Sequence, residues 1–263
     1  MRSDILGYTF WGRPILCLQG GDGPRRVLIC AAHHGSEWIT MLLLRRFWSE
    51  FCVRGDWRRA AHLWVVPCVN PDGCALSMGQ VAPWSPQYLC ARSIARREPD
   101  LPFPSGWKAN GRGVDLNLNY PALWDQAVET KGLAGPAPRN WPGPCPFSEE
   151  ETRLLAELTV LAEPDVMVTL HAQGEEIYWE FGGIPVAGAE SLGRLMAERS
   201  GYRLTSVPPE SAYAGYKDWF IQEFRRPGYT VECGLGENPL PVRETDQIYR
   251  AVRPILRTAL LGC

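Results

Sequence analysis

Four short apolar runs stand out along the chain, and each is followed by polar residues or glycine. They cover Val27–Ala32, Leu63–Val69, Asp165–Leu170 and Tyr229–Cys233. A short run of this kind predicts a strand that is buried on both faces. A weaker run over Ile177–Phe181 predicts a further strand.

Segments with the pattern of helices lie between these runs. They cover Ile39–Phe51, Ser148–Ala162, Glu190–Ser200, Lys217–Arg225 and Glu244–Leu261. The alternation of strands and helices predicts an α/β fold with a central, mixed, mostly parallel twisted sheet that helices cover on both faces. No linker, charge block or repeat divides residues 1–263, so we expect a single domain.

Residues typical of turns and helix caps predict how these elements are connected. Asn70-Pro-Asp-Gly73 follows the second run and predicts a turn. Ser148, with Glu151 three residues later, predicts a capping box at the start of a helix. Residues 74–147 hold many proline, glycine and tryptophan residues with little periodicity, so we expect a long functional loop region there.

Polar side chains gather where the predicted strands end. His34 and Glu37 follow the first apolar run, Asn70 follows the second, His171 follows the third, and Glu232 lies near the end of the fourth. Sites in α/β sheets lie beyond the carboxyl ends of the strands. We therefore expect these side chains to converge on one crevice.

Composition narrows the classes of partner. The net charge of −2 gives no electrostatic case for binding nucleic acid or an anionic membrane. Neither a signal-like apolar stretch at the N-terminus nor an apolar run of membrane-spanning length is present, so we expect a cytoplasmic protein. Nine scattered cysteines without a CxxC pair predict reduced thiols, several of them buried, as at Cys30, Cys68 and Cys233.

His34 and Glu37 are a candidate metal-binding pair. An imidazole and a carboxylate three residues apart can close on one ion, and they are nitrogen and oxygen ligands that Zn²⁺ takes. His33 is a rival ligand, but only His34 has the HxxE spacing. The spacing alone is a weak signal, and it gains weight from the polar strand ends further along the chain.

Five segments, in this order and with these gaps, resemble the zinc metallocarboxypeptidase family. They are His34–Thr40, Val66–Gly73, Gly113–Asn117, Thr169–His171 and Thr230–Glu232. The resemblance implies a zinc carboxypeptidase-like fold and one Zn²⁺ per chain.

The family resemblance also implies roles for individual residues. It implies that His34, Glu37 and His171 hold the Zn²⁺, with water in the open position, and that Glu232 is the general base. Three protein ligands and a water are typical of a catalytic rather than a structural zinc site. Asp115 either orients a ligand histidine or serves the hydrogen bonds of the turn before Leu116.

One position departs from the digestive carboxypeptidases. There the segment resembling Gly113–Asn117 continues with an arginine, and the Asn-Arg pair binds the terminal carboxylate of the substrate. Here Asn117 is followed by Leu118, which cannot form a charge-assisted pair with a carboxylate. We expect both residues to contact a substrate that is held in a different way.

A narrower resemblance suggests which substrate that is. The string 107–121, together with 139–144, 148–152, 213–219 and 232–239, resembles the bacterial γ-D-glutamyl-diamino acid endopeptidases. These enzymes hydrolyse the bond between D-Glu and meso-diaminopimelate or L-Lys in cell-wall peptides. Their substrate carries several carboxylates and an amine at unusual positions.

Two further roles have two candidates each. The family usually has an arginine that stabilises the oxyanion five residues before the glycine of Gly-Val-Asp, and here that place holds Lys108, with Arg112 close by. Both stay candidates. Tyr213 and Tyr216 flank a glycine before a helix, and one of them either closes over the substrate, as a mobile tyrosine does in the family, or is a rim aromatic.

The leading hypothesis is a zinc hydrolase that cleaves the γ-D-glutamyl-diamino acid bond of muropeptide stem peptides, which are its small-peptide partners. A second hypothesis is a carboxypeptidase that removes C-terminal residues from ordinary peptides, against which Leu118 argues. A third is a peptide-binding protein without catalysis, against which Glu232 argues, since binding needs no general base. The sequence carries no signal for an oligomeric state.

Overall fold

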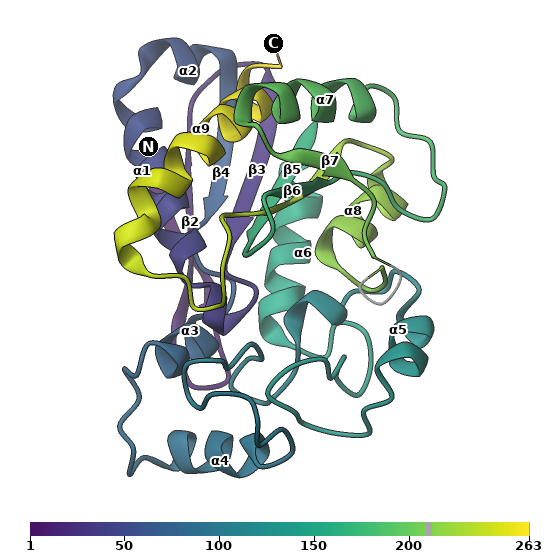
Figure 1. Cartoon of the computed structure of the whole chain (residues 1–263). Coiled ribbons are helices and arrows are strands. Elements are labelled where there is room, and N and C mark those ends of the chain that lie inside the picture. Colours follow the sequence, from purple (N-terminus) through teal and green to yellow (C-terminus); the bar gives the residue numbers. More distant parts are fainter. Residues whose placement is uncertain (209–211, 263) are drawn as a thin grey trace.

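The computed structural model describes residues 1–208 and 212–262. An eight-stranded sheet runs through its upper part in the order β1-β2-β4-β3-β5-β8-β6-β7 (Figure 1). The strands are β1 (Arg2–Tyr8), β2 (Pro14–Gly20), β3 (Arg25–Ala31), β4 (Ala61–Val66), β5 (Val166–His171), β6 (Glu176–Tyr178), β7 (Arg203–Thr205) and β8 (Gly228–Glu232). Neighbouring strands run parallel across β4, β3, β5 and β8, and antiparallel pairs join β1, β2 and β6 to that centre. The predicted mixed α/β sheet is confirmed.

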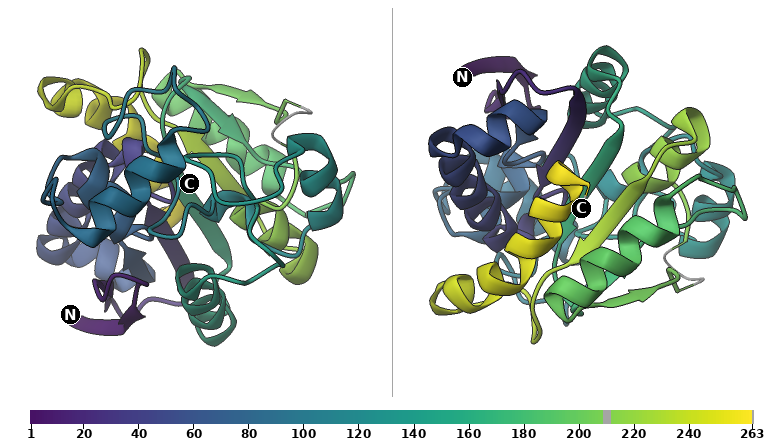
Figure 2. Two further views of the ribbon diagram at one scale, coloured as in Figure 1. Left: turned by 90° about the horizontal axis from the view of Figure 1, so that it is seen from below. Right: turned by 90° about the horizontal axis from the view of Figure 1, so that it is seen from above.

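Helices lie on both faces of the sheet, as the view from above in Figure 2 shows, and further helices lie below it in Figure 1. They are α1 (Ile39–Val53), α2 (Gly55–Ala60), α3 (Pro71–Ser77), α4 (Pro86–Ala95), α5 (Trp124–Lys131), α6 (Glu150–Ala162), α7 (Ala189–Ser200), α8 (Tyr216–Phe224) and α9 (Thr245–Leu261). Short 3₁₀ turns are η1 (Gly35–Glu37), η2 (Leu116–Leu118) and η4 (Val242–Glu244). None of the helices among the described residues combines the length and apolar composition that crossing a membrane requires.

Alternate strand residues build the two sides of the core. Val27 and Ile29 of β3 pack with α1, α2, α7 and α9, whereas Leu28 and Cys30 pack with α6 and α8. Period-two alternation of the side chains explains this division. Because both faces are covered, β3 is apolar from Val27 to Ala31, which is why the sequence shows a continuous run rather than alternation.

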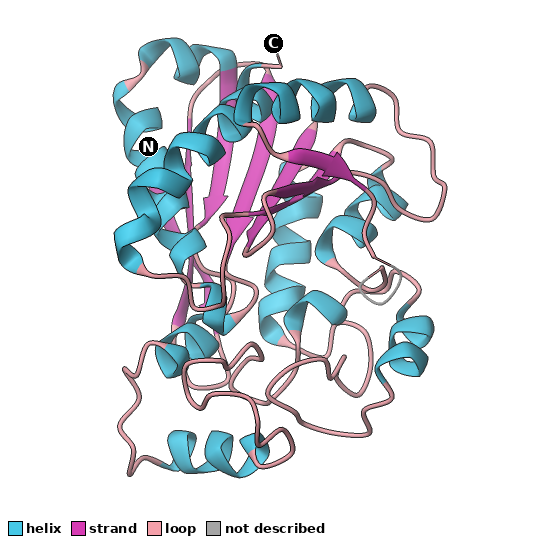
Figure 3. Cartoon of the chain, viewed as in Figure 1, coloured by secondary structure: helices cyan, strands magenta, loops and turns pink. Residues whose placement is uncertain are grey.

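The carboxyl ends of the parallel strands point toward a half of the molecule that is rich in loops, which are pink in Figure 3. This half holds α3, α4 and α5 and much of residues 74–147. The expected long loop region is therefore present, but it contains two helices, α4 and α5, that the sequence analysis missed. Ser85 caps α4 by accepting the Tyr88 N–H, and Pro86 occupies the first turn, a start signal that is readable in the sequence.

Three predictions at element ends are wrong. The segment Asn70–Gly73 begins helix α3 rather than forming a simple turn, with Asn70 as its N-cap and Pro71 as its first residue. The run predicted as a strand to Val69 ends at Val66, because Pro67 has no N–H for the ladder. The extent of the strand from Ile177 is also corrected, since β6 covers Glu176–Tyr178.

The predicted capping box at Ser148 is absent. Glu149 is the N-cap of α6, without a side-chain cap bond, and the Ser148 hydroxyl donates to the Glu149 carboxylate at 2.8 Å. Glu151 turns inward instead, because Asn110 of the long loop donates to both carboxylates, at 2.8 Å to Glu149 and 3.4 Å to Glu151. Both glutamates are 1% exposed. They fix the loop at the cost of burying two acids.

The burial of Glu151 makes the stability of the fold depend on pH. Desolvation, with the neighbouring Glu149 charge, raises the pKa of Glu151 from its ordinary 4.5 to about 8. Between these pH values the folded chain holds a proton that the unfolded chain has released. The free energy of unfolding therefore falls as pH rises through this window.

We predict that Glu151→Gln removes this pH dependence. The variant should gain stability relative to wild type as pH rises from 4.5 to 8, by on the order of 2–4 kcal/mol. Urea denaturation across this pH range, in the presence of chelator, measures the difference. Exposed Glu150→Gln, on the same helical turn, is the control and should stay within about 0.5 kcal/mol of wild type. A difference for Glu151→Gln that does not change with pH would contradict the assignment.

Candidate metal centre and active-site cavity

Three strand ends deliver the candidate metal ligands and the candidate base. His34 is the N-cap of η1, the turn that follows β3, and Glu37 is the last residue of that turn. His171 ends β5 and Glu232 ends β8, and these two residues are directly opposite each other in the parallel ladder. The structure thus brings together four side chains that are up to 198 positions apart in the printed sequence.

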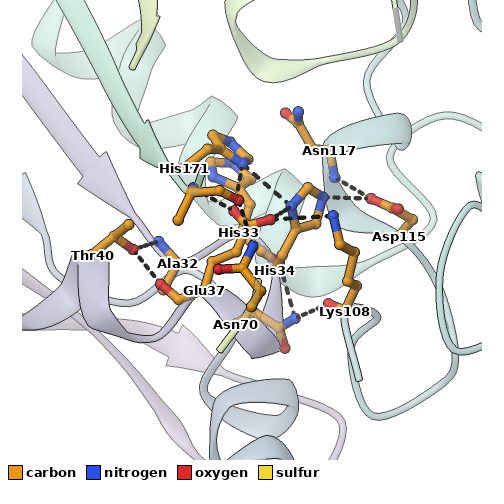
Figure 4. A network of polar contacts seen from close by, with 12 residues as sticks. Ala32, His33, His34, Glu37, Thr40, Asn70, Lys108, Asp115, Asn117 and His171 are labelled. Carbon is orange, nitrogen blue, oxygen red and sulfur yellow. Dashed lines mark hydrogen bonds and ion pairs between the residues drawn. The ribbon is translucent and has the colours of Figure 1, made fainter. Parts of the chain in front are cut away.

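His34, Glu37 and His171 form a compact donor set, shown in Figure 4. The Nδ1 atom of His34 lies 2.8 Å from Oε1 of Glu37, and Nδ1 of His171 lies 3.0 Å from Oε2. The two Nδ1 atoms are 3.3 Å apart, and one candidate ligand atom from each residue lies within 4.8 Å of the others. Two imidazole nitrogens and a carboxylate facing one another are donors that suit Zn²⁺.

His33, the rival ligand, is bonded elsewhere in the core. Its Nε2 atom lies 3.1 Å from the Tyr120 hydroxyl, and its Nδ1 atom lies 3.3 Å from Oγ1 of Thr169. The residue is fully buried, and burial holds its pKa well below the ordinary value. Both ring nitrogens therefore have polar partners outside the donor set, while the face of the His33 ring stacks on His171.

Asp115 fills both roles considered for it. Its Oδ1 atom lies 3.0 Å from Nε2 of His34, which leaves Nδ1 of that ring directed at Glu37 (Figure 4). The same carboxylate accepts the Asn117 N–H at 3.2 Å and the Asn140 N–H at 3.0 Å. Holding the outer nitrogen fixes the orientation and tautomer of a ligand imidazole.

The charges around the donor set oppose the cost of burial. Burial alone would lower the pKa of His34, but the carboxylates of Glu37 and Asp115 raise it to about 10. Burial lowers the pKa of His171 despite its bond to Glu37. A proton on His34 and a cation on the donor set compete for the same nitrogen, so metal uptake should weaken as pH falls.

The donor set opens into a cavity of about 310 Å³. Glu232 lines it, and burial together with the Glu37 charge raises the pKa of Glu232 to about 8. Asn117 and Leu118 also line the cavity, and their contact with a substrate stays a prediction. The Asn117 side chain is anchored, since its Oδ1 atom accepts the Tyr216 N–H at 3.1 Å.

The structure separates the two candidate cations. Lys108 lines the cavity, its Nζ atom lies 3.3 Å from Oε1 of Glu37, and its side chain is 31% exposed. Carboxylates of Glu37, Asp115 and Glu232 keep its pKa raised although burial opposes the charge. Arg112 does not line the cavity, and its half-exposed guanidinium lies near Glu149 and over the Phe10 ring. Of the two candidates for the oxyanion role, only Lys108 therefore lines the cavity.

The two candidate tyrosines also differ in position. Tyr216 is fully buried, its hydroxyl lies 2.7 Å from Oγ1 of Thr159, and its ring stacks on His33. It is a core residue, so the expectation that it closes over the substrate or sits at the rim is wrong. Tyr213 is partly exposed and stays a prediction.

Asn70 is the positioning residue that the sequence analysis undervalued. Its Nδ2 atom donates to the carbonyl oxygens of His33, Lys108 and Ala109 at 3.0–3.2 Å, while its Oδ1 atom caps α3 by accepting the Gly73 N–H (Figure 4). This one side chain ties the His34 turn to the Lys108 loop. The sequence did hold a signal for this role, because an asparagine followed by a proline after an apolar run is typical of a helix N-cap.

Comparison with known proteins finds relatives over nearly the whole chain. The zinc carboxypeptidase family matches residues 1–252. Gamma-D-glutamyl-L-diamino acid endopeptidase 1 of Lysinibacillus sphaericus is 34% identical over 272 residues, spanning 99% of this chain and 67% of that protein. Carboxypeptidase A from Helicoverpa armigera superposes with a TM-score of 0.71 at 17% identity, covering 100% of this chain and 69% of that one. Murein-tripeptide amidase MpaA from Escherichia coli O157 gives 0.63 at 22% identity, covering 99% and 92%.

Proposed function

Because this chain belongs to the zinc carboxypeptidase family, a family of zinc metallopeptidases, we propose that it hydrolyses the bond between γ-D-glutamate and a diamino acid in peptidoglycan-derived peptides. The observation that carries the proposal is Leu118. It lines the cavity at the position where digestive carboxypeptidases place the arginine for a terminal carboxylate. The 34% identity to gamma-D-glutamyl-L-diamino acid endopeptidase 1 of Lysinibacillus sphaericus supports the same choice.

The residues of the donor set suit the metal that the family uses. His34, Glu37 and His171 would hold it. When bound, Zn²⁺ supplies a Lewis acid that activates water and polarises the scissile carbonyl. Asp115 holds the outer nitrogen of His34, so that this ring keeps its orientation when substrate enters.

Glu232 is placed to move protons. Its carboxylate takes a proton from the attacking water and returns it to the nitrogen of the leaving amine. The raised pKa of Glu232 favours this exchange near neutral pH, since the group then accepts and releases a proton at comparable cost. Lys108, on the same cavity wall, offers an ammonium to the negative charge that develops on the carbonyl oxygen.

Cleavage of a defined stem peptide tests the proposed function. We predict that zinc-loaded protein releases L-Ala-D-Glu from L-Ala-γ-D-Glu-meso-diaminopimelate, detected by mass spectrometry, and that chelator abolishes the release. Glu232→Gln should retain zinc and lose turnover, because the amide cannot take the proton. An intact tripeptide together with trimming of ordinary C-terminal residues would replace the proposal with the carboxypeptidase reading, and cleavage of neither would favour a binding protein.

Lys108 and Arg112 provide a matched pair for the oxyanion role. Lys108→Met should lower kcat by about 10²–10³-fold, the loss typical when one oxyanion donor is removed. Arg112→Met should change kcat less than about threefold, because the guanidinium lies outside the cavity. Steady-state kinetics on the stem tripeptide measures both. Equal losses in the two variants, or a larger loss for Arg112→Met, would overturn the assignment to Lys108.

A further inference from the structure

Cys68 and Cys74 lie in contact beside the start of helix α3. Their Sγ atoms are 3.6 Å apart, and neither residue lines the cavity or belongs to the donor set. Cys74 is 2% exposed, whereas Cys68, which we expected to be buried, is partly exposed. When an oxidant can reach one thiol and a second thiol is in contact with it, oxidation can end in a disulfide. The proposed hydrolysis uses neither sulfur.

Both cysteines belong to an anchored segment, so a bond between them changes the backbone. A disulfide bond is about 2.05 Å long, so the two sulfurs have to approach each other by about 1.5 Å. On the Cys68 side, the Asn70 N–H donates to the Ala32 carbonyl oxygen at 3.0 Å, just after β3. On the other side, the Cys74 N–H donates to the Asn70 carbonyl oxygen at 3.0 Å within α3. Formation of the disulfide therefore displaces the chain around Asn70.

The chain around Asn70 supports the turn that carries two of the metal ligands. The backbones of η1 and of the first turn of α3 are in direct contact, since a Cβ atom on Gly35 would lie 2.5 Å from the carbonyl group of Gly73. The Asn70 side chain donates to the carbonyl oxygens of His33 and Lys108 at 3.0 and 3.2 Å. The Gly35 N–H donates in turn to the Lys108 carbonyl oxygen at 2.8 Å. A displacement of this segment is thus transmitted to η1 and to the ligands at its two ends.

We propose that Cys68 and Cys74 form a redox modification site, at which a peroxide joins the two thiols in a disulfide and thereby weakens metal binding at the neighbouring donor set. The Cys68 sulfur first takes an oxygen from hydrogen peroxide, which gives a sulfenic acid and one water. The Cys74 sulfur then attacks the Cys68 sulfur, the S–O bond breaks, and a second water leaves. The two thiols lose two electrons and two protons, which reduce the peroxide to two waters. The effect on metal rests on the donor set of the proposed function, whereas the disulfide itself does not.

Peptide mapping of the metal-free protein after treatment with hydrogen peroxide tests the disulfide. Cleavage before Asp72 puts the two cysteines into different peptides, 56–71 and 72–99, so that only a disulfide keeps these peptides joined. We expect the joined peptides in oxidised wild type and their separation after reduction with a phosphine. They should persist in Cys90→Ser, which removes the exposed cysteine of the second peptide, and should be absent from Cys68→Ser and Cys74→Ser. Separate peptides in oxidised wild type would overturn the proposal.

Zinc affinity tests the link between the disulfide and the donor set. After the peroxide is removed, competition with a chromophoric chelator should give oxidised wild type a zinc Kd about 10- to 100-fold higher than reduced wild type, the loss typical when the groups that orient metal ligands are disturbed. Cys68→Ser is the matched control, because this position is partly exposed and tolerates a hydroxyl. Its Kd should stay that of reduced wild type with and without peroxide. An unchanged Kd in wild type that carries the disulfide overturns the proposal.

Hydrogen exchange gives a second readout that needs no metal. In the oxidised wild type, the Gly35 amide should lose protection, because its bond to the Lys108 carbonyl depends on the position of Asn70. Cys68→Ser should keep this protection after peroxide treatment. If reduced wild type binds no zinc, the donor set of the proposed function fails, and exchange at Gly35 decides the inference separately. Loss of protection supports it, whereas equal protection in the reduced and oxidised proteins overturns it.

Discussion

The buried carboxylate of Glu37 is the constraint on which the functional half of the molecule depends. It is 1% exposed, and burial alone would raise its pKa. His34 and Lys108 hold the pKa well below the ordinary value, and His171 and the Ala172 N–H add hydrogen bonds. A buried charge without such partners is costly. The turn after β3, the end of β5 and the Lys108 loop must therefore all meet at one point.

Polar side chains, together with a small apolar cluster that includes Leu76 and Trp107, build the loop-rich half around that point. Asn70 binds the backbone on both sides of the cavity rim, and Asn110 joins the loop to two buried glutamates of α6. Asn119 does the same for the backbone at Pro142 and Cys145. Each of these amides satisfies several buried groups at once. Such fully bonded networks hold a loop in one geometry, which a site assembled from separate strands requires.

The sequence predicted the central strands of the sheet for a physical reason, but it gave no sign of β1, β2 or β7. Strands such as β3 and β5 are buried on both faces, so their apolar runs are unmistakable, and polar residues at their ends have few other reasons to be there. Prediction failed where a side chain contacts residues that are distant in the sequence instead of its local neighbours. Glu151 looked like a capping residue but turns toward Asn110, and Tyr216 looked like a loop aromatic but packs on His33. Long-range partners decided both cases, and no local pattern contains them.

The central claim is that His34, Glu37 and His171 hold one zinc ion with a position left open for water. Zinc K-edge X-ray absorption on protein loaded with one equivalent of the metal tests it most directly. The account predicts two imidazole nitrogens, a carboxylate and a further light-atom ligand at about 2.0–2.2 Å, with stoichiometric binding lost in His171→Ala. Sulfur scattering at about 2.3 Å, or zinc retained at full occupancy in that variant, would contradict it.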